Sequence, residues 1–331
     1  MSIVSRKKNH IQICLREDVQ SEIPSGFDDY RLEHKALPET DFADISLETE
    51  FLGRKISAPV LISSMTGGPD DGNRINHVLL EAANELKIPF AFGSLRVFIE
   101  ELSLGKIEKP RKIAPDIPIL ANLGAVQLNY RFTRDSCLYA VEITEADALY
   151  LHLNPLQEVF QVSGNTNFSG LLPKIETLCK DFPVPILIKE VGSGISASDA
   201  RRLTDAGVSM IDVAGAGGTS WVKVETIADG RPETADLAAP FFDWGISTAQ
   251  CIEAIHLQYP DIRLIASGGI TNGVEVWKAL LLGAELAGIA RPLLKPALNG
   301  TAATVAFLTT IINQTRIAKF VSEKIVKVGQ F

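Results

Sequence analysis

Eight short apolar segments recur along this chain of 331 residues, and helix-like stretches separate them. This alternation limits the possible fold more than any other feature. The segments lie at residues 58–65, 89–94, 117–124, 148–154, 185–192, 210–218, 263–270 and 286–294. Runs that are apolar on both faces are typical of parallel strands covered by helices. The pattern therefore predicts an α/β protein in which right-handed crossovers join parallel strands.

Eight β–α units favour a closed (β/α)8 TIM barrel. An open, doubly wound sheet is the alternative, but its GxGxxG fingerprint does not follow the first segment. We expect residues 58–331 to form a single catalytic barrel domain. Residues 1–57 are predicted to be an N-terminal extension that packs on the barrel, caps it or reaches a neighbouring subunit. Residues 219–245, after the sixth strand, are expected to form a long rim loop suited to a lid or subunit contact.

Composition and charge exclude several classes of protein. Hydrophobic residues make up 46% of the chain, which is enough for a folded core. The formal net charge of −8 argues against proteins that bind nucleic acids or anionic membranes. The sequence predicts neither a secretory signal nor a bilayer-spanning segment. Four cysteines without a CxxC motif predict neither a zinc site nor disulfides, so we expect a cytoplasmic protein.

Polar or glycine-rich residues follow nearly every predicted strand, at the barrel end where active sites form. Turns at Gly268–Gly269 and Ala290–Arg291 offer backbone N–H groups to a phosphate, although glycines there can also simply make tight turns. Lys189 lies within an apolar strand, where an unpaired charge is costly. It needs either a carboxylate partner, such as Glu190 or Asp212, or an electron-poor ring such as a flavin.

The segment at residues 152–158, HLNPLQE, is the most unusual part of the sequence. His152 and Asn154 are two residues apart, so both point to the same side of a strand. Glu158 offers one carboxylate. This suits Mg²⁺, which keeps bound waters and takes further ligands from substrate phosphates. A solvated loop acid is the alternative for Glu158.

A short basic run, RKKNH, occupies residues 6–10. Such a run is normally a solvated tail. The alternative is that Arg6, Lys7 and His10 close over an anionic substrate while Arg96 approaches it from below. Arginine suits this role because its guanidinium binds oxyanions through two parallel hydrogen bonds.

Together these motifs resemble the type 2 isopentenyl-diphosphate isomerases, the flavin-dependent class, from residue 6 to about residue 294. The matching motifs are RKxxH (6–10), SMTGG (64–68), GSxR (93–96), ANLG (121–124), HLNPLQE (152–158), KEVGxG (189–194), AGxGGTSW (214–221), SGGI (267–270) and GIAR (288–291). RKxxH and HLNPLQE are the specific motifs, because the lysine strand, GGTSW and SGGI recur in related FMN barrels. Leu95 stands where this family usually has Gln, so a side-chain hydrogen bond from that position is not expected.

The resemblance implies an FMN site and a substrate site that share one cavity. The FMN-binding residues would be Ser64, Met65, Thr66, Ser94, Asn122, Lys189 and Thr219, with the phosphate on the backbone of Gly268, Gly269, Ile270, Ala290 and Arg291. The substrate-binding residues would be Arg6, Lys7, His10, Ser94, Arg96, Asn154 and Gln157. The implied catalytic residues are His152, Gln157 and Lys189, and Glu158 would bind Mg²⁺.

The implied reaction is the interconversion of isopentenyl and dimethylallyl diphosphate by an allylic proton shift in isoprenoid biosynthesis. A proton must be added at C4 and one removed at C2, and no thiol or carboxylate pair in the sequence is arranged to protonate an alkene. We therefore hypothesise that reduced FMN is the acid–base group and that NADPH reduces it without being consumed at each turnover. The resemblance also implies a homo-oligomer, a tetramer or an octamer.

Three other functions are alternatives. An FMN-dependent 2-hydroxy-acid oxidase or dehydrogenase needs a His base with an Arg pair for the substrate carboxylate near the seventh strand, and SGGITNG offers neither. A reading as an inosine-monophosphate dehydrogenase needs a nucleophilic Cys in a rim loop. Cys137, Cys179 and Cys251 fall in predicted helices, and Cys14 falls in the N-terminal extension. A flavin-binding redox sensor without turnover needs neither RKxxH nor Glu158.

Overall fold

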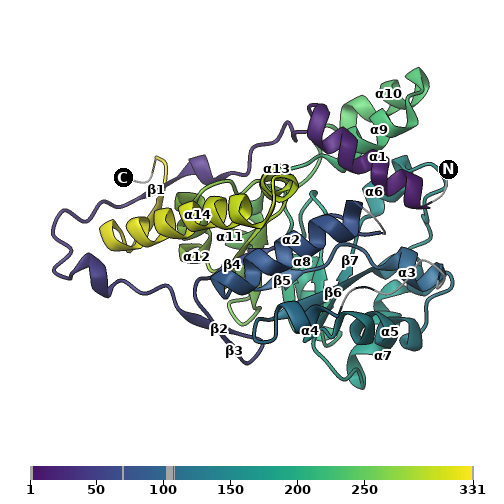
Figure 1. Cartoon of the computed structure of the whole chain (residues 1–331). Helices are drawn as coiled ribbons and strands as arrows, with labels where there is room; N and C mark the ends of the chain where they lie inside the picture. Colours follow the sequence, from purple (N-terminus) through teal and green to yellow (C-terminus); the bar gives the residue numbers. More distant parts are fainter. Residues whose placement is uncertain (1–2, 69–70, 102–106, 108, 330–331) are drawn as a thin grey trace.

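The computed structural model describes residues 3–68, 71–101, 107 and 109–329. Its parallel strands form a closed barrel in the order β10-β11-β4-β5-β6-β7-β8-β9 (Figure 1). Their bounds are β4 Val60–Ile62, β5 Phe90–Ala91, β6 Ile119–Gly124, β7 Ala148–His152, β8 Ile186–Lys189, β9 Met210–Asp212, β10 Leu264–Ser267 and β11 Leu286–Ile289. Each strand lies within one of the segments predicted from the sequence, so the (β/α)8 fold is confirmed.

Helices cover the outside of the barrel. The long outer helices are α2 Asp71–Leu86, α5 Arg134–Thr144, α7 Leu171–Lys180, α8 Ala197–Asp205, α11 Thr248–Gln258, α12 Gly273–Leu281 and α14 Thr301–Val321. Shorter helices are α3 Arg96–Glu100, α4 Pro110–Ile113, α6 Pro155–Phe160, α13 Leu294–Leu298 and the 3-10 turns η4 Ala125–Asn129 and η6 Arg291–Leu293. The last long helix, α14, packs along α2 and α12 (Figure 1). Among the described residues, none of the helices has the length and apolar character needed to cross a bilayer.

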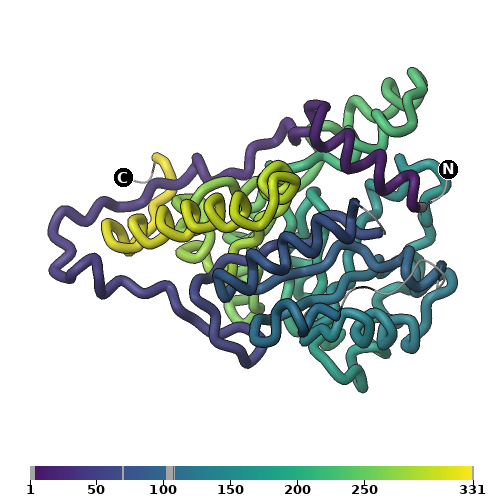
Figure 2. Tube along the Cα trace, in the orientation of Figure 1, coloured from purple at the N-terminus to yellow at the C-terminus, as the bar shows by residue number. Residues whose placement is uncertain are grey.

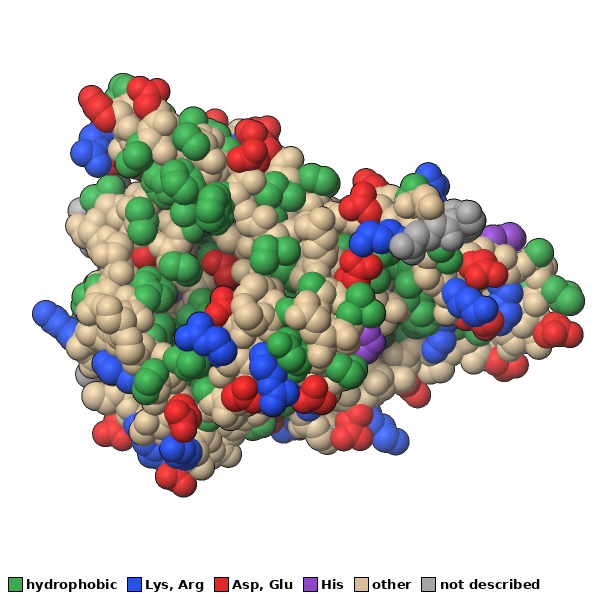
Figure 3. Space-filling model, turned by 180° about the vertical axis from the view of Figure 1, so that it is seen from behind, with side chains coloured by type: hydrophobic (Ala, Val, Ile, Leu, Met, Phe, Trp, Pro, Cys, Tyr) green, Lys and Arg blue, Asp and Glu red, His purple; other side chains and the backbone are tan. Residues whose placement is uncertain are grey.

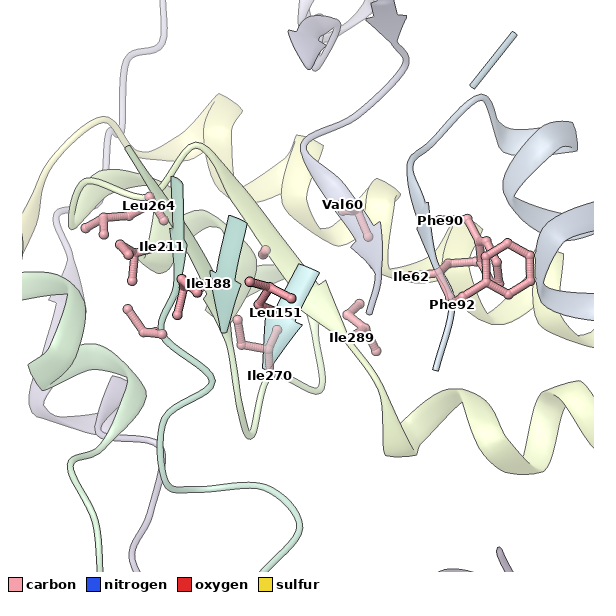
Figure 4. Close-up of a cluster of buried hydrophobic side chains, with 14 of the residues drawn as sticks. Val60, Ile62, Phe90, Phe92, Leu151, Ile188, Ile211, Leu264, Ile270 and Ile289 are labelled. Carbon is pink, nitrogen blue, oxygen red and sulfur yellow. The ribbon is translucent and has the colours of Figure 1, made fainter. Parts of the chain in front are cut away.

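The strands bury apolar side chains in two separate layers. Outward-pointing residues such as Val60, Ile188 and Ile289 pack against the helices, and Figure 4 shows part of this layer. Inward-pointing residues such as Leu61 and Leu187 form a second cluster inside the barrel. Because successive side chains of a strand point to opposite faces, one apolar run supplies both layers.

The N-terminal extension reaches both ends of the barrel. It contains α1 Ile3–Arg16, η1 Phe27–Asp29, β1 Tyr30–Leu32, η2 Phe42–Asp44 and a hairpin of β2 Thr49–Phe51 and β3 Arg54–Ile56. Between α1 and the hairpin the chain makes an elongated excursion beside α14 (Figure 2). Strand β1 pairs there with the C-terminal strand β12 Ile325–Lys327. Phe51 and Ile56 of the hairpin join the inner cluster and close the barrel floor.

The segment after the sixth strand is helical, not the long loop that we expected. It holds α9 Trp221–Asp229, α10 Pro232–Ala238 and the turn η5 Ala239–Phe241. Two local features favour helices here. The Ser220 side chain accepts the N–H of Lys223 at the start of α9, and Pro232 is the first residue of α10. Hydrophobic side chains gather on this lobe (Figure 3), where Leu237 and Trp244 are exposed.

We predict that Phe51→Ala lowers the free energy of unfolding by about 3 kcal/mol, because it opens a cavity under the barrel floor. The Phe51 side chain is buried in the inner cluster. Urea unfolding monitored by circular dichroism measures the change. Leu37→Ala is the control, since Leu37 is 72% exposed and its loss should change stability by no more than about 0.5 kcal/mol. Equal effects of the two substitutions would show that the hairpin does not stabilise the barrel.

Candidate active site

Polar residues occupy the inward positions directly above the apolar layer of the barrel. Leu187 is followed two residues later by Lys189, Met210 by Asp212, and Ile265 by Ser267. Tyr150 is likewise followed by His152, and Leu120 by Asn122. Because the side-chain period of a strand is two, these groups converge from neighbouring strands at the carboxyl end of the barrel.

A cavity of about 280 Å³ opens above this polar layer. All of the residues that the sequence analysis assigned to the site line it: Arg6, Lys7, His10, Ser64, Met65, Thr66, Ser94, Arg96, Asn122, His152, Asn154, Gln157, Glu158, Lys189, Thr219, Gly268, Gly269, Ile270, Ala290 and Arg291. The structure therefore brings the predicted residues together from the N-terminal extension and all eight strand ends.

Helix α1 places the side chains of Arg6, Lys7 and His10 at the mouth of the cavity. Lys7 Nζ donates a hydrogen bond of 2.6 Å to the carbonyl of Ser94, after β5. His10 packs edge-on against Trp221 of α9, with ring centroids 5.4 Å apart. The helix thus spans the mouth of its own barrel, and the alternative of a solvated tail does not hold for α1.

The mouth concentrates positive charge. Burial lowers the pKa of Arg6, and burial together with the charges of Arg6 and Arg96 lowers the pKa of Lys7 to about 7. Arg96 is partly engaged already, because its guanidinium donates to Glu100 (2.8 Å) and Asn165 (2.9 Å). A buried group of cations is stabilised by an anion, so this end of the cavity suits a diphosphate.

His152 and Asn122 form a neutral pair in the middle of the cavity. Burial and the nearby charge of Lys189 lower the pKa of His152 to about 3, so the imidazole is neutral at physiological pH. Its Nδ1 lies 2.7 Å from the Asn122 Oδ1. With Nδ1 protonated in that hydrogen bond, Nε2 is left as an acceptor facing Gly124.

Glu158 is a buried acid, which contradicts the alternative of a solvated loop residue. It is 5% exposed, and its carboxylate accepts hydrogen bonds from Asn154 Nδ2 (3.0 Å), Gln161 Nε2 (3.3 Å) and the Asn165 N–H (2.5 Å). All of these donors are neutral. The carboxylate therefore has no cation to balance it among its hydrogen-bond partners in the described chain.

Lys189 has no carboxylate oxygen within ion-pair distance among the described residues. Its Nζ donates instead to the carbonyl of Glu190 at 2.5 Å. The Glu190 carboxylate accepts the N–H groups of residues 191, 192 and 193 at 2.6–2.7 Å, and Asp212 is bound by hydroxyl groups. The ammonium group therefore remains available to the cavity that it lines.

The glycine turns at the phosphate end are tightly packed against neighbouring backbone. Gly268 and Gly269 have φ values of +106° and +74°, and a Cβ on Gly268 would meet the Gly215 oxygen at 2.1 Å. This packing by itself accounts for glycine at these positions. The Arg291 guanidinium donates to the Gln20 side chain, which in turn donates to the Gly217 carbonyl at 2.6 Å.

Glu225, Trp221 and Gln20 contact the site but were not assigned from the sequence. Gln157 Nε2 donates to the Glu225 carboxylate at 2.8 Å, and His10 Nε2 lies 3.3 Å from it. The sequence contained a signal for Glu225, because it follows Trp221 by one helical turn and in a helix the two side chains share a face. We expected a loop after the sixth strand, so this helical spacing was not recognised. Leu95 is buried in the apolar core, which agrees with the absence of a polar role there.

Comparisons of sequence and structure place the chain among FMN-binding barrels. The family model described as "FMN-dependent dehydrogenase" matches residues 149–317. A flavocytochrome b2 variant with pyruvate bound has a TM-score of 0.69 at 17% identity, covering 94% of this chain and 78% of the other. A mandelate oxidase variant has a TM-score of 0.64 at 16% identity, covering 98% and 95%. At this identity the solved structures support the fold alone.

Curated relatives resolve the family. The isopentenyl-diphosphate delta-isomerase of Nostoc sp. is 48% identical over 93% of this chain and 90% of its own length. That of Pseudescherichia vulneris is 49% identical over 96% and 92%. The chain therefore belongs to the isopentenyl-diphosphate delta-isomerases, in their FMN-dependent type 2 class.

We predict that inorganic diphosphate binds at the mouth with uptake of roughly one proton at pH 8. Lys7 is largely neutral there because its pKa is about 7, and a bound anion raises that pKa and protonates it. Affinity should therefore fall as the pH rises above 7. Isothermal titration calorimetry in buffers of different ionisation enthalpy measures the uptake.

Lys7→Arg is the matched control for this experiment, because arginine keeps its charge at every pH tested. The difference between the two proteins also removes the protons released or taken up by diphosphate itself. Equal proton uptake by Lys7→Arg and the unmodified protein would contradict the prediction.

Proposed function

We propose that this chain interconverts isopentenyl diphosphate and dimethylallyl diphosphate, with reduced FMN as acid–base group, Mg²⁺ on the diphosphate and NADPH as the source of flavin reduction. The observation that carries the proposal is that three kinds of group line one cavity. They are the cations of α1, neutral polar groups such as His152, and Lys189, which lies beside His152 on the next strand. Family membership supports the reaction, and the residue roles are our proposal.

The floor of the cavity fits FMN. The Ser64 Oγ is buried and has no hydrogen-bond partner among the described residues, so a ligand group would satisfy it. We propose that Ser64, Met65, Thr66, Ser94, Asn122, Lys189 and Thr219 hold the ring and ribityl chain, and that the backbone of residues 268–270 and 290–291 holds the phosphate. When bound in its reduced form, FMN would supply the group that adds a proton at C4 and removes one at C2.

The side of the cavity near α6 fits Mg²⁺. No cluster of three His, Cys, Asp or Glu side chains that could hold a metal is found in the described part of the chain. Glu158 therefore needs help from the substrate, as Mg²⁺ allows. The Asn154 Oδ1 is a second oxygen here, buried and without a partner among the described residues. We propose that Glu158 orders Mg²⁺ against the diphosphate and that Asn154 supports it.

The neutral middle of the cavity would orient the hydrocarbon. We propose that Gln157 contacts this end of the substrate, because its amide is fixed by Glu225 of α9 and by Asn154. His152 stays uncharged and presents Nε2 toward the cavity. Arg6, Lys7, His10, Ser94 and Arg96 would hold the diphosphate, so the extension contributes to substrate binding while the barrel carries the cofactor.

Two further expectations concern the whole molecule. The tetramer or octamer and the cytoplasmic location remain predictions. The exposed apolar side chains on the lobe of α6, α9 and α10, among them Val159, Leu237 and Trp244, are available for contacts between subunits (Figure 3).

The test is product analysis after anaerobic incubation with isopentenyl diphosphate, FMN, Mg²⁺ and a substoichiometric amount of NADPH. We expect dimethylallyl diphosphate in large excess over the NADPH supplied, because isomerisation involves no net redox change. Product limited to the amount of NADPH would show that the reduced flavin is oxidised at each turnover, which contradicts an isomerisation without net redox change. Bound FMN without any product would favour a sensor and overturn the isomerase proposal.

We predict that Glu158→Gln raises the Mg²⁺ concentration needed for half-maximal activity at least about tenfold and leaves FMN affinity unchanged. The amide keeps the shape but loses the charge that binds the cation. Activity against Mg²⁺ concentration and FMN fluorescence quenching are the two measurements. Glu176→Gln, an exposed acid on α7, is the control. An unchanged Mg²⁺ requirement would remove Glu158 from the metal site.

A further inference from the structure

Asp212 is a buried carboxylate that the proposed reaction does not use. It lies at the end of β9, and its exposed fraction is 0%. Strand pairing puts it directly beside Lys189 of β8, and Lys189 lines the cavity. Ionised carboxylates are almost never fully buried without compensation, so this position needs an explanation.

The Asp212 carboxylate accepts three hydrogen bonds. Oδ1 accepts the Ser267 hydroxyl at 2.6 Å and the Ala214 N–H at 3.3 Å, and Oδ2 accepts the Tyr150 hydroxyl at 3.1 Å. Both oxygens thus receive hydrogen bonds from groups on β7, β10 and the end of β9. The Ala214 N–H can only donate, and the two hydroxyl groups are able to donate, so all three can serve an ionised carboxylate, which can only accept.

Lys189 is the charged residue that interacts with Asp212. Burial raises the pKa of Asp212, and the charge of the buried Lys189 is the largest effect that opposes this rise. In return, the charges of Asp212 and Glu190 oppose the burial that lowers the pKa of Lys189. Glu190 is bound by backbone N–H groups, and His152 is neutral. Asp212 and Lys189 therefore act as a pair, although no ion-pair contact joins them.

We propose that Asp212 is a positioning residue for the cofactor: it keeps the Lys189 ammonium charged at the cavity floor, and so sets how strongly the protein favours reduced over oxidised FMN. The inference rests on the proposed function, because it places the flavin ring above Lys189. The charge of a protonated lysine stabilises negative charge on a reduced ring, whereas a neutral amine does not. Tyr150 and Ser267 hold the carboxylate in place without adding charge.

The decisive experiment measures the midpoint potential and the absorption spectrum of bound FMN in the unmodified protein and in Asp212→Asn. The amide keeps the size of the side chain but not its charge. We expect the affinity for reduced relative to oxidised FMN to fall about tenfold, which for a two-electron couple lowers the potential by about 30 mV. We also expect the spectrum of the reduced flavin to shift from the anionic toward the neutral form.

Two controls separate this role from a structural one. Asp147→Asn removes another carboxylate of the barrel, bound to Arg54 and Arg111 at the opposite end, and should leave the potential unchanged. In a Lys189→Met background, Asp212→Asn should not lower the potential further, because the group through which it acts is gone. A potential that is unchanged or raised in Asp212→Asn alone would overturn the inference.

Other outcomes are also informative. If Asp212→Asn does not fold, Ser267→Ala and Tyr150→Phe each remove one donor and should lower the potential by a smaller amount. No shift in either would again overturn the inference. If the unmodified protein isomerises its substrate while Asp212→Asn keeps the same potential, only this inference fails. If the unmodified protein binds no FMN, the proposed function fails and the inference fails with it.

Discussion

The closure of eight short parallel strands is the constraint on which the site depends. A strand of three or four residues has only one or two inward positions. In β6, β7, β8, β9 and β10 an inward residue of the apolar cluster is followed two positions later by a polar one. The apolar positions meet Phe51 and Ile56 and make a dry floor. The polar positions therefore lie at the carboxyl end of the barrel, at a common height. Lys189, Asp212 and His152 converge there because the barrel is closed, not because they are near in sequence.

The features set by local pattern could be predicted from the sequence. The eight segments contained every strand of the barrel, since a run buried on both faces is a local property. The predicted barrel was enough to predict that the motifs converge at its carboxyl end. What could not be predicted depends on contacts between distant segments. The two strands of the hairpin beneath the floor are polar apart from Phe51 and Ile56, and a loop was expected where α9 lies. Neither the closure of the floor by the hairpin nor the contacts of Glu225 were therefore anticipated.

Side-chain partners were the hardest part of the site to predict. Arg96 and Arg291 both line the cavity, as expected, yet their guanidinium groups bind Asn165 and Gln20. A sequence shows that an arginine lies near an anion site, but not which neighbour holds it before the anion arrives. Lys7 differs, because within the described chain its Nζ donates to a backbone carbonyl and its charge is opposed by Arg6 and Arg96. It is therefore the mouth residue most sensitive to an incoming anion.

The distribution of charge within the cavity also explains how an acidic protein can hold an anionic substrate. The net charge of −8 repels a diphosphate at long range, but screening limits this to about 10 Å in ordinary salt. Within that distance the cations of α1 dominate. Deeper in the cavity, the neutral pair of His152 and Asn122 lies beside Lys189 of the next strand. We expect a ligand with a charged head and an apolar tail to bind with its head at the cations of α1.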